Sequence, residues 1–237
     1  TQPNALAPIP TSTGPTNATS MDFAVNFDEA VQNFDDASDL VITHSGTASG
    51  VVTITGGPLN YTVTLSGITG DGSLKLAVNL LSDVRDMAGN SLATAPDSAS
   101  VIFDHTPPTI AISMPSPDTT ATGPVDFTVT YTGASSTSLD ASDITLNATV
   151  SALGVVSVSG SGNTYTVRIA SISGDGGITF SIAAGTAVDA AGNLASAAGP
   201  SPVLTVDSAP QLSLHMGVPV AILLGLVGAF ALRRRTA

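Results

Sequence analysis

Residues 60–73 read NYTVTLSGITGDGS, and residues 164–177 read TYTVRIASISGDGG, 104 positions further along the chain. The same offset relates residues 36–40, DASDL, to residues 140–144, DASDI. Blocks that recur in the same order indicate a tandem duplication. The chain therefore contains two copies of one domain of about 100 residues, which is an ordinary domain size.

Apolar and polar residues alternate over short segments of each copy, which is the pattern of half-buried β-strands. Gly, Ser, Asp and Pro separate these segments. The strands expected in the second copy are Ile110–Ser113, Val125–Tyr131, Asp143–Asn147, Leu153–Val158, Thr164–Ala170, Ile178–Ala183 and Val203–Val206. Seven such strands predict an all-β protein of two tandem antiparallel β-sandwiches. Tyr61 and Tyr165 occupy matching inward positions, so we expect both side chains to be buried.

A proline-containing linker, Asp104-His105-Thr106-Pro107-Pro108, joins the two copies. Adjacent prolines have a fixed φ and favour extended backbone, so we expect the domains to lie end to end with limited bending. We place the first repeat at residues 1–106, the second at residues 107–210 and a C-terminal tail at residues 211–237. The Gly-Asp-Gly segments at residues 70–72 and 174–176 are predicted to be hairpin turns, because each lies between two strands.

The charge and cysteine content exclude several classes of function. All 18 acidic residues lie within residues 1–210, and the basic residues of the same stretch are Lys75, Arg85 and Arg168. A field of this sign repels nucleic acid, so nucleic acid is not an expected partner. The chain has no cysteine, which removes disulfides and thiol chemistry and leaves apolar burial as the source of stability.

The sequence offers no catalytic constellation, and we predict that the chain is not an enzyme. Its three histidines, His44, His105 and His215, fall at a strand end, in the linker and in the C-terminal tail, so they are not expected to converge. The remaining carboxylates, such as Asp35 and Asp36, are explained by the frequency of Asp in turns.

The C-terminal tail predicts a membrane anchor. Residues 212–232 carry no formal charge, and 21 helical residues span about 30 Å, the thickness of the bilayer hydrocarbon. Arg233, Arg234 and Arg235 follow at once. Basic residues beside a span stay on the cytoplasmic side, so residues 1–210 should face the periplasm or the exterior. The alternative is a buried core helix, but an otherwise strand-like chain leaves it no sheet face to cover.

The same tail resembles the tripartite C-terminal sorting tails of Gram-negative bacteria, of the IPTL-CTERM and PEP-CTERM varieties. The resemblance rests on the Pro-containing segment at residues 209–213, the apolar span and the Arg cluster. It implies that a membrane sorting protease is a partner. The segment departs from the family motif at Ala209, Gln211, Leu214 and His215, which bears on processing more than on insertion.

A second resemblance covers residues 1 to about 210. Residues 86–90 read DMAGN and residues 189–193 read DAAGN, and each is followed by a strand that ends in Asp and a Pro-containing linker. This pattern is similar to the bacterial Ig-like repeats of large surface adhesins. It implies an Ig-like fold and a surface protein, but it names no surface ligand.

These features favour a membrane-proximal extracellular stalk that presents upstream domains of a larger exported bacterial protein. The alternatives are direct adhesion to a surface ligand, or accessory repeats of an exported enzyme whose catalytic domain lies upstream. The chain begins without Met and without a signal peptide, so we expect it to be a piece or a mature product of a longer protein.

Calcium is the one ion that the sequence brings into consideration. In an Ig-like sandwich the loops that hold Asp140, Asp143, Asp189 and Asn193 lie at the N-terminal end of the second repeat, beside Asp104 of the first. Five oxygen donors at a junction could hold Ca²⁺, which takes six to eight oxygen ligands. The other interpretation is that these residues cap turns, and the lack of an Asp-x-Asp-x-Asp-Gly loop favours it. No other cofactor is expected.

Overall fold

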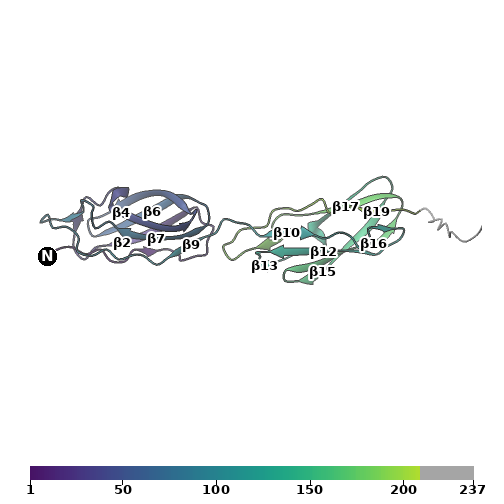
Figure 1. The fold of residues 1–237 in the computed structure, drawn as a ribbon, viewed down its shortest axis with the longest axis horizontal. Helices are drawn as coiled ribbons and strands as arrows, with labels where there is room; N and C mark the ends of the chain where they lie inside the picture. Colours follow the sequence, from purple (N-terminus) through teal and green to yellow (C-terminus); the bar gives the residue numbers. More distant parts are fainter. Residues whose placement is uncertain (209–237) are drawn as a thin grey trace, which may run out of the picture.

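The computed structural model describes residues 1–208, which form two β-sandwiches placed end to end (Figure 1). The first sandwich contains β1 Ile9–Pro10, β2 Ser20–Asn26, β3 Val31–Gln32, the 3-10 turn η1 Ala37–Asp39, β4 Leu40–Gly46, β5 Ser49–Gly56, β6 Asn60–Thr69, β7 Gly72–Val78, β8 Arg85–Asp86 and β9 Val101–Phe103. The second contains β10 Thr109–Ile112, β11 Thr119–Thr120, β12 Val125–Thr132, β13 Ser136–Thr137, the 3-10 turn η2 Ala141–Asp143, β14 Ile144–Ala148, β15 Leu153–Ser161, β16 Thr164–Ser173, β17 Gly176–Ile182, β18 Ala187–Val188 and β19 Leu204–Val206.

The strand order is that of an immunoglobulin sandwich. In the second repeat one sheet has the order β10-β12-β16-β15 and the other contains β19-β17-β14. Lettered along the chain, the long strands give A-B-E-D in one sheet and G-F-C in the other, which is the constant-type arrangement. The first repeat has the same two sheets, β1-β2-β6-β5 and β4-β7-β9. The prediction of two tandem Ig-like sandwiches is therefore confirmed for the described residues.

Two local features differ from the sequence prediction, which was of antiparallel strands with Asp143 at the start of one of them. Strand β11 pairs in parallel with β19, and Thr16 forms a parallel bridge to Phe103 in the first repeat. In the second repeat the chain leaves the first sheet after β10. It continues in the same direction, as β11, beside β19, the last strand of the other sheet, and this pairing is parallel. Asp143, predicted to begin a strand, instead ends the turn η2, where Asp140 and Asp143 form a reciprocal capping box.

Each repeat has its own apolar core, built from the inward faces that the alternation predicts. Phe127 and Phe180 come from opposite sheets of the second repeat, are both fully buried, and pack edge-on with ring centroids 5.0 Å apart. Tyr165 is buried as expected, at 7% exposure. Tyr61 is only partly buried, although it packs against the first core and its hydroxyl donates to the Val31 carbonyl at 3.3 Å.

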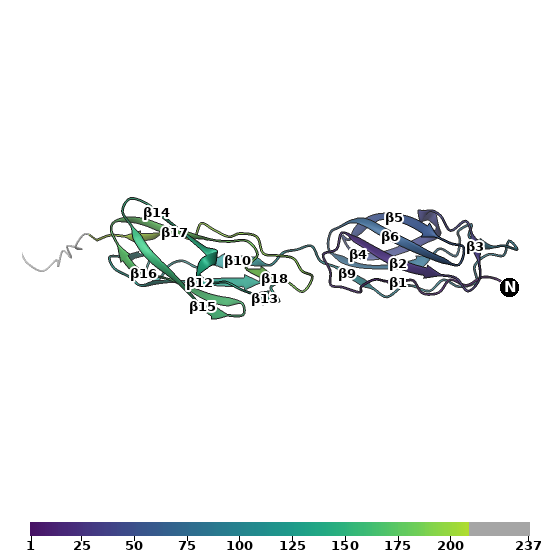
Figure 2. The same ribbon diagram turned by 180° about the vertical axis from the view of Figure 1, so that it is seen from behind.

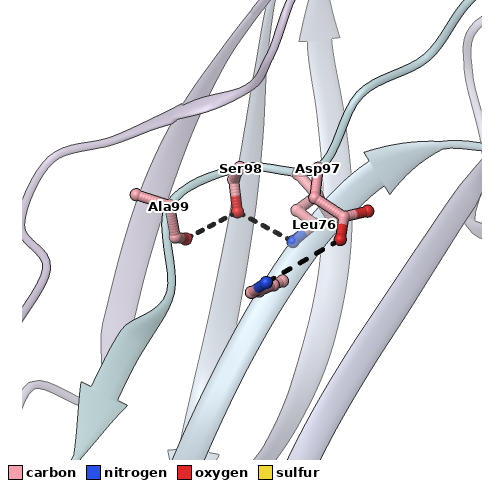
Figure 3. A network of polar contacts seen from close by, with 5 residues as sticks. Leu76, Asp97, Ser98 and Ala99 are labelled. Carbon is pink, nitrogen blue, oxygen red and sulfur yellow. Dashed lines mark hydrogen bonds and ion pairs between the residues drawn. The ribbon is translucent and has the colours of Figure 1, made fainter.

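In each repeat a buried serine pairs with an interior strand of the second sheet, just before the last strand begins to pair with it. Ser98 Oγ accepts a hydrogen bond from the Leu76 amide at 2.9 Å and donates to the Ala99 carbonyl at 2.8 Å (Figure 3). The Ser98 amide in turn donates to the Leu76 carbonyl at 2.8 Å. Ser201 makes the same contacts with Phe180. A side chain thus satisfies a strand amide that a neighbouring strand would otherwise pair.

The predicted membrane span, residues 212–232, lies outside the described residues, as do Arg233, Arg234 and Arg235. Within residues 1–208 no helix is long and apolar enough to cross a membrane.

Candidate functional site at the junction between the repeats

The first repeat holds the linker through its Gly-Asp-Gly turn. The Asp71 carboxylate accepts hydrogen bonds from the His105 amide at 2.6 Å and from the Thr106 hydroxyl at 2.5 Å. Nδ1 of His105 is 2.9 Å from the Gly70 carbonyl oxygen. The hydrogen bonds from Thr106 and His105 lower the pKa of Asp71 below its ordinary value. The linker is therefore fastened to the first repeat by an ionised carboxylate.

The backbone of this turn requires glycine. Gly72 has a φ of +144°, and a Cβ at this position would collide with the Ser45 carbonyl oxygen. The close approach sets Asp71 at the end of the sandwich where the chain leaves it. The same turn recurs at Asp175, which accepts hydrogen bonds from the Ser208 amide at 2.7 Å and hydroxyl at 2.6 Å. Both repeats thus hold the segment that follows them.

The second repeat holds the linker from the other side through residues 189–193. Asn193 Nδ2 donates to the Asp104 carbonyl at 2.7 Å and to the Asp189 carboxylate at 2.9 Å. The Asp189 carboxylate also accepts from the Ala191 and Asn193 amides, at 2.9 and 2.8 Å. Burial alone would raise the pKa of Asp189, but these hydrogen bonds outweigh it and lower the pKa below its ordinary value.

One main-chain hydrogen bond joins the two repeats directly. The Asn17 amide, at the C-terminal end of the first sandwich, donates to the Ala191 carbonyl at 3.2 Å. Figure 1 and Figure 2 show a single segment of chain passing from one sandwich to the other. The junction therefore combines a covalent linker, hydrogen bonds to that linker from both repeats, and the hydrogen bond between Asn17 and Ala191, which joins the repeats without involving the linker.

The structure brings together three of the five calcium candidates. Asp104, Asp189 and Asn193 meet at the junction, but Asn193 contributes its amide nitrogen as a donor, and the Asp104 carboxylate accepts from the Thr106 amide at 3.0 Å. The carboxylates of Asp140 and Asp143 instead accept their hydrogen bonds within the turn η2. In the part of the chain that the structure describes, no three His, Cys, Asp or Glu side chains are grouped so that they could hold a metal ion.

The sequence predicted hairpin turns at the Gly-Asp-Gly segments. It did not predict that the Asp of each turn accepts hydrogen bonds from the segment that follows its repeat. The signal was present, because both copies keep the Asp at the same offset and each copy ends in an Asp that is followed closely by a hydroxyl residue, Thr106 or Ser208. What the repeat could not show is that the turn carboxylate points along the chain toward the next segment.

Comparison with known proteins finds similar solved structures but no family. No protein-family profile matches it, and no curated protein does. The similar solved structures include the Escherichia coli adhesin FdeC, at 16% identity and a TM-score of 0.34, covering 86% of this chain and 62% of that one. The Yersinia pseudotuberculosis adhesin InvE matches at 16% identity and a TM-score of 0.28, covering 86% and 59%. The titin fragment I67–I69 matches at 14% and 0.35, covering 83% and 65%.

This chain thus spans less than two thirds of the length of these three structures. Because the identities and TM-scores are low, the Ig-like assignment rests on the strand order and register of the chain itself. The class that these define is an all-β protein of tandem Ig-like repeats.

Proposed function

We propose that this chain is a membrane-proximal stalk of a bacterial surface protein, in which two Ig-like modules hold upstream domains away from the membrane. The observation that carries the proposal is the junction. A spacer must resist bending, and here Asp71, Asn193 and the Asn17 amide fix the linker and the adjoining ends of both repeats. Structural spacing requires no cofactor and no catalytic group.

The rigidity of the junction can be measured from the distance between two spin labels by pulsed electron paramagnetic resonance. The described residues contain no cysteine that would react with the label. Thr53 and Ser157 are exposed and equivalent positions on β5 and β15. Spin labels on Thr53→Cys and Ser157→Cys in the full chain should give one narrow distance distribution. A broad distribution would contradict the stalk.

Two carboxylates provide a matched pair of variants for this measurement. Asp71→Ala removes the acceptor that holds His105 and Thr106, so the distribution should broaden. Asp175→Ala removes the same group from the second repeat, where it holds Ser208 rather than the junction, and the distribution should stay narrow. Equal broadening in both variants would show that the turn acts on the fold of its own repeat and not on the linker.

The membrane topology is a further part of the proposal. Residues 212–232 would span the membrane, Arg233, Arg234 and Arg235 would face the cytoplasm, and residues 1–210 would lie outside. Protease added to intact spheroplasts should then remove both repeats, whereas their protection would refute the topology. If a sorting protease processes the tail, mature protein from the native host should lack the Arg cluster.

A calcium ion at the junction stays a separate proposal. Asp104, Asp189 and Asn193 would have to exchange hydrogen bonds for metal bonds, with an affinity in the extracellular range of about 10⁻⁴ to 10⁻³ M. Calorimetric titration of the full chain with Ca²⁺ would detect this binding, and Asp189→Ala should abolish it. Absence of heat would leave the hydrogen-bonded junction as the device that orders the linker.

A further inference from the structure

The N-terminal end of the first repeat carries the same loop that the second repeat places against its neighbour. The Asp86 carboxylate accepts from the Ala88 and Asn90 amides, each at 2.8 Å, and from Asn90 Nδ2 at 2.7 Å. Asn90 Nδ2 also donates to the Thr1 carbonyl at 3.2 Å. Asn193 makes the same bonds to Asp189, and it also meets the incoming chain, at the Asp104 carbonyl, which in strand register lies two residues before the position of Thr1. The loop is therefore already folded into the shape that the observed junction uses.

The two loops differ in what covers them. Ala191 and Asn193 are buried, at 9% and 8% exposure, whereas Ala88 and Asn90 are exposed. Ala191 receives the Asn17 amide of the preceding repeat, and Asn193 contacts the carbonyl of Asp104. The positions that the junction covers in the second repeat are thus the ones that stand open in the first.

The segment that leads into the first repeat has the register of the linker. Ala5 bridges to Phe27, and Ile110 pairs with Tyr131, which is the residue equivalent to Phe27. This register aligns residues 1–3, Thr-Gln-Pro, with residues 106–108, Thr-Pro-Pro, and Pro3 and Pro108 are both buried. Thr1 therefore occupies the position of Thr106, whose hydroxyl donates to Asp71 of the preceding repeat.

We propose that the surface formed by Thr1, Ala88 and Asn90 is a docking site for a further Ig-like module of this same kind, joined ahead of Thr1. That module would bring a Gly-Asp-Gly carboxylate to the Thr1 hydroxyl, which here makes a long 3.4 Å contact with Glu29. It would also bring a main-chain amide to the Ala88 carbonyl, as Asn17 does for Ala191. This inference rests on the proposed stalk function and names the partner that the stalk accepts.

The test is a chain in which a copy of residues 1–105 precedes Thr1 of the full protein. The new junction then reads Asp-His-Thr-Gln-Pro where the existing one reads Asp-His-Thr-Pro-Pro. Spin labels on Thr53→Cys in the added copy and in the resident first repeat report on the new junction. Labels on resident Thr53→Cys and Ser157→Cys report on the existing one. The two distance distributions should agree in centre and in width.

Three variants of the extended chain sharpen the result. Thr1→Val removes the hydroxyl but keeps the shape of the side chain, and Asn90→Ala removes the donor to the incoming segment, so each should make the new distribution several-fold wider. Leu81→Ala changes a side chain that is 94% exposed at the same end, and it should leave the width unchanged. Hydrogen exchange across residues 1–104 verifies that the first repeat stays folded in each variant.

The outcomes separate the two proposals. A broad distribution at the new junction beside a narrow one at the existing junction would overturn the docking site and leave the stalk standing. Broad distributions at both junctions would overturn the stalk and the docking site together. A new junction that stays narrow in both Thr1→Val and Asn90→Ala would also overturn the docking site, because these side chains would then not make it.

Discussion

The two repeats fill the same end of the sandwich with different chemistry. In the first repeat the rings of Phe27, Phe34 and Tyr61 pack edge-on, with centroids 4.9 to 5.8 Å apart. In the second repeat Tyr131 replaces Phe27, and its hydroxyl donates to Thr186 Oγ1 at 2.8 Å. Ser138, which is exposed, takes the position of Phe34.

This difference shows how much freedom the backbone leaves to the side chains. A cluster of three rings closes the first sandwich, and two tyrosines that each form a hydrogen bond with a threonine, Tyr131 with Thr186 and Tyr165 with Thr137, close the second. Apolar burial is non-directional and scales with area, whereas a buried hydroxyl must find a partner. Substitutions at matched positions can therefore measure each contribution, with chemical denaturation for stability and hydrogen exchange to assign unfolding to one repeat.

The largest expected effect is that of Phe34→Ala. Phe34 is 2% exposed, so its truncation should cost the first repeat about 3 to 5 kcal/mol of unfolding free energy. Ser138→Ala at the matched exposed position should change the second repeat by no more than about 0.5 kcal/mol. Similar losses in the two repeats would show that the ring cluster is not what closes the first sandwich.

The next effect concerns what the repeats share. Ser201→Ala leaves the buried Phe180 amide without its acceptor and should cost the second repeat about 1 to 3 kcal/mol. Ser98→Ala does the same to the Leu76 amide, so the first repeat should lose a similar amount. If only one substitution lowers the stability, the serine contact is not a stabilising feature common to the two sandwiches.

A smaller loss is expected for Tyr131→Phe. Tyr131 and Thr186 are each 2% exposed, and removal of their hydrogen bond should cost about 1 kcal/mol. The reciprocal change, Phe27→Tyr, places a hydroxyl within the ring cluster of the first repeat and should destabilise it as well. Neutral or stabilising results for both changes would mean that the two ways of closing the end are interchangeable.

The smallest effect is expected on the outer face. Arg168 makes two hydrogen bonds to the Asp126 carboxylate, at 2.7 and 2.8 Å, where Thr64 contacts Asp22 in the first repeat. Both side chains of the ion pair are about half exposed, so Arg168→Thr should reduce stability less than Phe34→Ala, Ser201→Ala or Tyr131→Phe does. The difference should vanish in about 1 M salt, where the screening length falls to roughly 3 Å.

The same pair predicts a pH dependence with a definite sign. The hydrogen bonds and charge of Arg168 lower the pKa of Asp126, so the pair contributes fully above the ordinary pKa of 3.8. Its contribution is lost as the pH falls through the lowered value. Melting curves of the parent chain and of Arg168→Thr should therefore converge at acid pH, and a constant gap would contradict this assignment.

The strands were predictable because burial on a sheet has a period of two residues. Phe127, Val129 and Tyr131 fall on one face by alternation alone, and the structure buries all three. Tyr61 was predicted to be buried but is only partly so. Its ring packs on Phe34, and alternation along a strand carries no information on neighbours that come from other segments. The parallel pairing of β11 with β19 was missed for a similar reason, since two residues are too few to show a period.

The site at the junction divides in the same way. The sequence by itself determined that there are two copies, where the linker lies, and that Asp71, Asp189 and Asn193 recur at fixed places, because a duplication preserves residue identity and spacing. Only the tertiary structure decided their partners. A carboxylate satisfies hydrogen-bond donors or a cation according to what lies within about 3 Å. That distance depends on how two folded repeats meet, with Asp71 on the linker amides and Asn193 on the Asp104 carbonyl.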